Sequence, residues 1–121
     1  MDDRKFICAC IDNNCDIVHL YLQKLKYRAS TIVLETGLMR ACEYGHLEVV
    51  KLLLEHGADL NCFCNWPASK AVQHDHIHII KYLFEDEDIK NRLQSECLKE
   101  AILCNSIKVL SFLRTNLLME I

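Results

Sequence analysis

Apolar residues recur at helical spacing in the stretch GHLEVVKLLLEHGADLN, residues 45–61. Leu47, Val50 and Leu54 are three and four positions apart, Val49 and Leu53 are four apart, and Glu48 and Lys51 are the charged residues between them. This spacing gathers the apolar side chains on one face of an amphipathic helix, and Gly57 follows its end. A single helix of this kind cannot bury its own apolar face. The pattern therefore predicts that another element packs against it.

The same pattern returns three more times along the chain. Four segments align without a gap when each is started at an alanine, and these alanines are Ala9, Ala41, Ala71 and Ala101. In every segment a turn residue follows four positions later, and a pair of aliphatic residues follows after eight and nine positions. Each copy predicts a short helix, a tight turn and a longer helix, with the alanine where helices approach closely.

The turn residues are of types that accept a left-handed backbone. They are Asn13, Gly45, Asp75 and Asn105. This column supports a tight connection between the two helices of each copy.

The second copy resembles the ankyrin repeat. Thr36, Leu38 and Ala41 match the Thr-Pro-Leu-His-x-Ala signature, and Gly45-His46 and residues 57–61 follow the rest of the family pattern. The resemblance extends over nearly the whole chain. It looks like the divergent ankyrin proteins that are abundant in large DNA viruses and intracellular bacteria.

The resemblance implies an all-α fold, an ankyrin-repeat solenoid of four helix-turn-helix repeats in a single domain. The repeats are expected at about residues 3–32, 33–64, 65–94 and 95–121. Copies 30 to 32 residues apart are shorter than the usual 33, so short or irregular fingers are expected between repeats. In copy three the acidic stretch 85–88 takes the place of a regular finger.

Composition agrees with a helical domain. The 121 residues are 51% apolar and 26% charged, which excludes disorder as the default, and three glycines and one proline are few for an all-β chain. A net charge of -3 gives no basic footprint for nucleic acid. No apolar run suits a membrane span or a secretory signal. We expect neither nucleic acid nor membrane as a partner, and a cytoplasmic location, the host cytoplasm or nucleus if the protein is viral.

Eight cysteines and six histidines raise the question of metal binding or catalysis. Without a signal peptide, free thiols in a reducing compartment are expected rather than disulfides. One alternative is a metal- or redox-responsive module that uses Cys62, Cys64, His74 and His76. Against it, His76 shares a column with His46, which in the family is a structural residue at the inter-helix turn. We expect no cofactor, no metal and no catalytic residue.

In the ankyrin family, partners usually dock on the concave face, which is made by the fingers and the inner side of the first helices. The resemblance therefore implies a non-catalytic protein–protein interaction module. By column, the first helices place on this face Arg40, Glu43, Lys70 and Gln73, with Glu100 and Leu103 in the last copy. The fingers add Asp59, Phe63 and Trp66. The alternative for Phe63 and Trp66 is that they cover the junction of copies two and three.

The two ends of the chain differ in polarity. Copy one is polar at its outer face, whereas Leu117, Leu118, Met119 and Ile121 are apolar where a polar cap is expected. We expect this tail to fold back over the last helix pair. The alternative is a structural subunit that self-associates, giving a monomer or weak homodimer through the C-terminal end.

Overall fold

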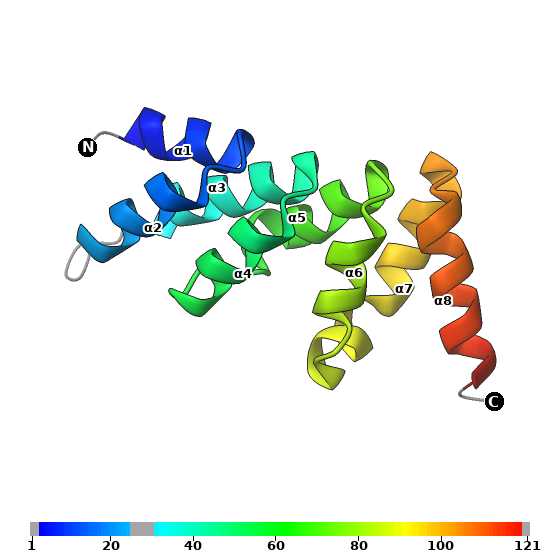
Figure 1. Ribbon diagram of the computed structural model, residues 1–121. Helices are drawn as coiled ribbons and strands as arrows, with labels where there is room; N and C mark the ends of the chain where they lie inside the picture. Colours follow the sequence, from blue (N-terminus) through cyan, green and yellow to red (C-terminus); the bar gives the residue numbers. More distant parts are fainter. Residues whose placement is uncertain (1–2, 25–30, 120–121) are drawn as a thin grey trace.

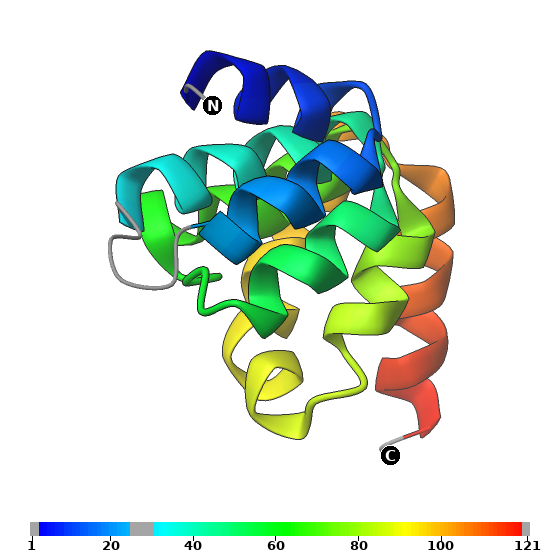
Figure 2. The same ribbon diagram turned by 60° about the vertical axis from the view of Figure 1, so that its left-hand side comes forward.

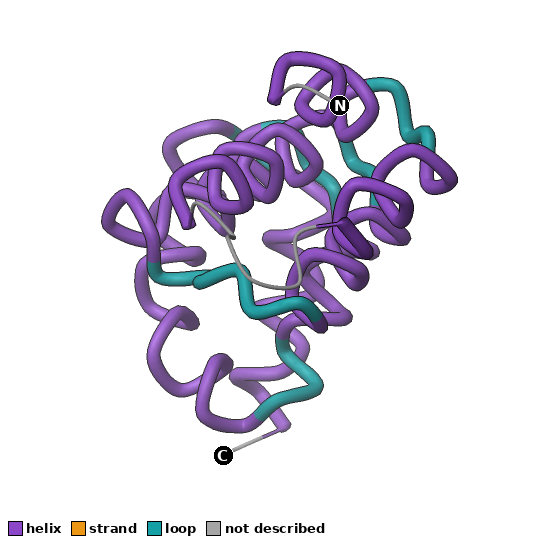
Figure 3. Tube along the Cα trace, turned by 90° about the vertical axis from the view of Figure 1, so that its left-hand side faces the viewer, coloured by secondary structure: helices purple, strands orange, loops and turns teal. Residues whose placement is uncertain are grey.

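The computed structural model describes residues 3–24 and 31–119, without the side chains of 31, 62–65 and 116–119. Within these ranges the chain forms eight α-helices and no strand (Figures 1 and 3). They are α1 (Asp3–Ile11), α2 (Cys15–Lys24), α3 (Thr31–Tyr44), α4 (Leu47–Glu55), α5 (Cys62–Gln73), α6 (Ile77–Leu83), α7 (Glu87–Cys104) and α8 (Ile107–Met119).

The helices form two layers of four. The first helices α1, α3, α5 and α7 contact one another in sequence, and so do the second helices α2, α4, α6 and α8. Each first helix also packs on the second helix that follows it, so the helix pairs stack side by side with α1 and α8 at opposite ends (Figures 1 and 2). The predicted all-α solenoid of four helix-turn-helix repeats is confirmed.

The predicted turn column has the expected backbone in all four copies. The φ angles are 59° at Asn13, 79° at Gly45, 57° at Asp75 and 55° at Asn105. The alanine column is buried, with an exposed fraction of 4% at Ala9 and 0% at the other three. Residues 41–50 and residues 71–80 also match position by position in whether each residue is buried, half-buried or exposed. Over these ten aligned positions, copies two and three therefore bury corresponding residues.

Each repeat after the first makes a side-chain hydrogen bond to the preceding repeat just after its own turn. His46 Nε2 lies 2.6 Å from the carbonyl oxygen of Ile11, and His76 Nε2 lies 2.8 Å from that of Glu43. In the last copy the Ser106 hydroxyl donates to the carbonyl of Val72. A carbonyl can only accept, so Nε2 carries the proton in both histidines. These bonds engage carbonyls at the ends of first helices, which have no partner within their own helix, and the Val72 carbonyl also accepts from the backbone N–H of Asp75.

The relative lengths of the helices differ from the prediction. In the last three repeats the first helix is the longer one: α3 has 14 residues and α4 has 9, α5 has 12 and α6 has 7, and α7 has 18 and α8 has 13. The first helices begin within segments that were expected to form fingers. The described connections are short, residues 56–61 before α5 and 84–86 before α7.

The acidic stretch of copy three explains one of these early starts. Asp86 is the N-cap of α7, and its carboxylate accepts hydrogen bonds from the backbone N–H groups of Asp88 and Ile89. Glu87 and Asp88 occupy the first turn, where negative charge interacts favourably with the helix dipole. The stretch 85–88 therefore starts a helix instead of forming an acidic finger.

Among the described residues, those at the C-terminal end of the stack include exposed apolar side chains. Residues 107–119 form one continuous helix, so the prediction that the tail folds back is wrong for 117–119. Cys10, Cys42 and Val72 are covered by the next repeat and fully buried, whereas Ile102 in the same column is 61% exposed. Leu103 and Ile107 are 81% and 64% exposed. The last described repeat therefore presents apolar side chains where each earlier one has a neighbour.

Two glycines allow the turn geometry to be tested. Both have a positive φ, 79° at Gly45 and 93° at Gly57, but a Cβ at Gly45 would lie 2.7 Å from two ring atoms of His76, whereas one at Gly57 would have nothing within 4 Å. Gly57→Ala should lower the free energy of unfolding by about 1 kcal/mol, the backbone cost alone. Gly45→Ala should lower it by about 2 kcal/mol or more, because the His76 ring must also leave the Glu43 carbonyl. Urea unfolding with linear extrapolation measures both. Equal losses would contradict the role given to His76.

Candidate functional site

Polar side chains of α3 and α5 are joined into one cluster. Glu43 lies between two cations: its Oε1 is 3.1 Å from Arg40 Nη1, and its Oε2 is 3.7 Å from Lys70 Nζ. The Lys70 ammonium also lies 5.5 Å from the centre of the Trp66 ring, within cation–π range. Arg40, Glu43, Lys70 and Trp66, here called the α3–α5 cluster, therefore hold one another in place across two repeats.

The cluster is only partly solvated. The exposed fractions of its charged side chains are 40% for Arg40, 14% for Glu43 and 22% for Lys70. Trp66 is 47% exposed, which is high for a large aromatic side chain. Two cations share one carboxylate, so the cluster carries a net positive charge.

A second link joins α5 to α7. Gln73 Nε2 donates to Glu100 Oε1 at 2.8 Å and has a longer contact, 3.5 Å, with Ser69 Oγ. The Cys104 thiol donates to the same oxygen of Glu100 at 3.7 Å. One set of side chains therefore links α3 to α5 and a second set links α5 to α7, and the two sets share no residue.

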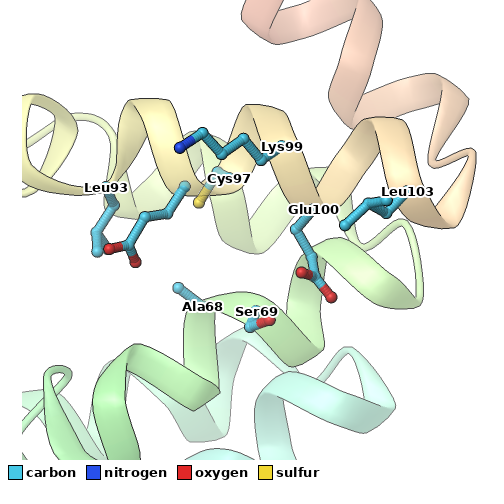
Figure 4. A pocket seen from close by; sticks show the side chains of 8 residues that line it. Ala68, Ser69, Leu93, Cys97, Lys99, Glu100 and Leu103 are labelled. Carbon is cyan, nitrogen blue, oxygen red and sulfur yellow. The ribbon is translucent and has the colours of Figure 1, made fainter.

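A groove of about 340 Å³ lies between α5 and α7, beside this second link (Figure 4). Its inner wall is made by Ala68, Leu93 and Cys97, which are 1%, 1% and 3% exposed. Its remaining lining residues are Ser69, Glu96, Lys99, Glu100 and Leu103. We call it the α5–α7 groove.

The cysteine in the groove reports its electrostatic character. Burial, together with the negative charges of Glu96 and Glu100, raises the pKa of the Cys97 thiol to about 12. Burial alone raises the pKa of Cys10 to about 12. Both thiols are therefore protonated at neutral pH and poor nucleophiles. None of the six cysteines whose side chains are described forms a disulfide.

The predicted site residues fall into three groups. Arg40, Glu43, Lys70, Gln73 and Trp66 lie on α3 and α5 and belong to the linked side chains described above. Asp59 is exposed in the loop before α5, where its carboxylate accepts from the backbone N–H of Asn61. The side chain of Phe63 lies outside the described residues. Trp66 was expected on a finger, and that placement is wrong, because it lies in the helix α5.

The residues of the α5–α7 groove were not singled out in the sequence, apart from Glu100 and Leu103. Leu93, Cys97 and Ala101 are spaced four residues apart and buried on α7, a helical pattern that the sequence does contain. The expected start of the fourth repeat near residue 95 leaves Leu93 outside the helix, so this buried face of α7 was not predicted.

Of the four residues of the alternative metal or redox site, the structure describes the side chains of His74 and His76. The backbone of Cys62 and Cys64 lies in the first turn of α5, and their side chains lie outside the described residues. His74 and His76 have ring centres 6.0 Å apart, but Nε2 of His76 bonds the Glu43 carbonyl and its ring lies against Gly45. This geometry favours the structural role of His76. Among the described residues, no group of three or more His, Cys, Asp or Glu side chains is arranged to hold a metal ion.

None of the described helices combines the length and the apolar character that a membrane span requires. Part of the chain is similar to the human (Homo sapiens) Ankyrin repeat and KH domain-containing protein 1. It is 41% identical over 49 residues, which are 40% of this chain and 2% of the relative. The chain thus matches only a small fraction of that protein's length. No solved structure matches the chain.

The match to a family is much broader. A family model described as ankyrin repeats in three copies matches residues 6–92 and again residues 38–117. Together with the stacked helix pairs and their left-handed turns, this match means that the chain belongs to the ankyrin-repeat family.

Proposed function

We propose that this chain is a non-catalytic interaction module that binds a partner protein on the surface of its first helices. Ankyrin repeats are generally protein-binding modules. The observation that carries the proposal for this chain is the α3–α5 cluster, in which the exposed Trp66 lies against Lys70, one of two cations that share the Glu43 carboxylate.

Two physical arguments support this surface. Tryptophan and arginine are the residues most enriched among those that dominate binding energy in protein interfaces. The cluster's side chains already bond one another, so a partner would immobilise them at a smaller loss of conformational entropy. A role limited to closing the junction between two repeats would leave nearly half of the Trp66 surface in water.

The identity of the partner depends on the source of the chain. If the protein comes from a large DNA virus or an intracellular bacterium, as its resemblance suggests, the partner is a host protein. The module would then act in the host cytoplasm or nucleus, for example on ubiquitin or innate-immune signalling.

Affinity capture from cell lysate tests the docking surface. A variant with Arg40→Ala and Trp66→Ala should lose the partners that the unchanged protein retains, because it removes the aromatic anchor and a cation. The control variant carries Leu20→Ala and Lys51→Ala, which remove an exposed leucine and a lysine from α2 and α4. The control should capture the same partners as the unchanged protein. Partners that survive the first variant would overturn the proposed surface.

A second candidate function is self-association through the open end of the stack. The observation that favours it is the exposure of Ile102, Leu103 and Ile107, three large apolar side chains on the last two helices. Apolar side chains gathered on a surface often mark a contact with another protein.

Light scattering over a range of concentrations tests this candidate. The mass should rise from monomer toward dimer as concentration increases, and Ile102→Glu with Ile107→Glu should keep the protein monomeric. Ile32 is equally exposed, 66%, but lies at the start of α3, so Ile32→Glu is the matched control and should leave association unchanged. A monomeric mass at every concentration would rule the candidate out.

A further inference from the structure

The α5–α7 groove combines an apolar inner wall with negative charge. Ala68, Leu93 and Cys97 offer buried apolar contact, while Glu96 and Glu100 stand one helical turn apart on α7. A volume of about 340 Å³ is at the small end of ligand pockets, so it suits one or two side chains rather than a folded element.

The charge of Glu100 is not neutralised within the described part of the chain. Its hydrogen-bond partners there are the Gln73 amide and the Cys104 thiol, both of which are neutral groups. The Glu100 side chain points toward Ser69 on α5, whereas the Lys99 side chain runs along α7 (Figure 4). The negative potential reaches the inner wall, since both carboxylates act on the Cys97 thiol and raise its pKa.

We propose that the α5–α7 groove receives an arginine or lysine side chain of the partner protein, with the aliphatic stem on Ala68, Leu93 and Cys97 and the cationic end at Glu100 and Glu96. This inference rests on the proposed function and specifies the chemistry of the partner. Long basic side chains bury their methylene groups on apolar surface while the charged end stays in a polar setting. The groove offers both environments side by side.

Other occupants fit less well. An acidic side chain would be repelled by two carboxylates. A purely apolar side chain would cover Glu100 without supplying a cation, and removing a carboxylate from water without a charged partner is unfavourable. A guanidinium or ammonium group forms charge-assisted hydrogen bonds with carboxylates, which are stronger than neutral ones.

NMR titration of the ¹⁵N-labelled protein tests the inference directly. The probe is the blocked tripeptide Leu-Arg-Leu, and its control has citrulline, the neutral isostere of arginine, in the central position. With the arginine peptide, the amide signals of Ser69, Cys97, Glu100 and Leu103 should shift and saturate. The citrulline peptide should bind roughly tenfold more weakly, because it lacks the charge.

Variants separate the charge from the fold. Glu100→Gln keeps an oxygen that can accept from Gln73 and should weaken the arginine peptide by the same roughly tenfold factor. Glu55→Gln removes an exposed carboxylate at the end of α4 and should change nothing. High salt should weaken binding to the unchanged protein but not to Glu100→Gln.

Each other outcome overturns the inference. Equal binding of the two peptides would mean a purely apolar groove, and an absence of shifts at the four groove positions would mean that no basic side chain enters it. Neither result affects the lysate experiment on Arg40 and Trp66. Loss of capture there, together with an empty groove, would leave the proposed function standing without this refinement.

Discussion

The close approach of successive first helices, made possible by the buried alanine column, is the constraint on which the rest of the structure depends. Ala41, Ala71 and Ala101 have no exposed surface, so each methyl group is enclosed by the helices around it. Because the helices are close, side chains on neighbouring repeats can meet: Lys70 reaches Glu43, and Gln73 reaches Glu100. The candidate binding surface follows from the core packing beneath it.

Hydrogen bonds made just after the turns fix the position of each repeat relative to the preceding one. A left-handed residue at each turn is followed by a side chain that bonds a carbonyl of the preceding repeat, His46 to Ile11, His76 to Glu43 and Ser106 to Val72. The Asp75 carboxylate adds another connection between repeats, since it accepts from the backbone N–H groups of Lys108 and Val109 at the start of α8. Stacking is thus supported by directional hydrogen bonds as well as by apolar contact.

The periodic features of this fold could be predicted from the sequence. The alanines, the turn residues and the aliphatic pairs recur at fixed offsets, and because Arg40, Glu43, Lys70 and Gln73 occupy matching columns, their shared surface followed from the repeat. The helix starts could not be predicted in the same way. The first helices α5 and α7 extend into the segments expected to form fingers, which is a local departure from the family pattern. As a result, Trp66 lies within a helix and Asp86 caps one.

The α5–α7 groove could not be predicted for a related reason. Leu93 contributes to its wall only because α7 begins at Glu87, before the expected start of the fourth repeat. The tail was likewise misjudged, because apolar residues at 117–119 are equally compatible with a continued helix and with a turn back over the stack. Periodicity in the sequence predicts the features that recur in every repeat. The early start of α7 and the course of the tail each occur once, so periodicity could not predict them.

The exposure of Ile102 also has a consequence for the local unfolding of the last helix pair. In a linear array each repeat is stabilised by its neighbours, and among the described residues α7 and α8 have a neighbour on one side only. Like α1 and α2 at the other end, this pair therefore opens more readily in local unfolding than repeats two and three. One wall of the α5–α7 groove belongs to α7, so an occupant that bridges both walls would bind only the closed form and shift the population toward it. Partner binding would then be thermodynamically coupled to the packing of α7 and α8 on the preceding repeat.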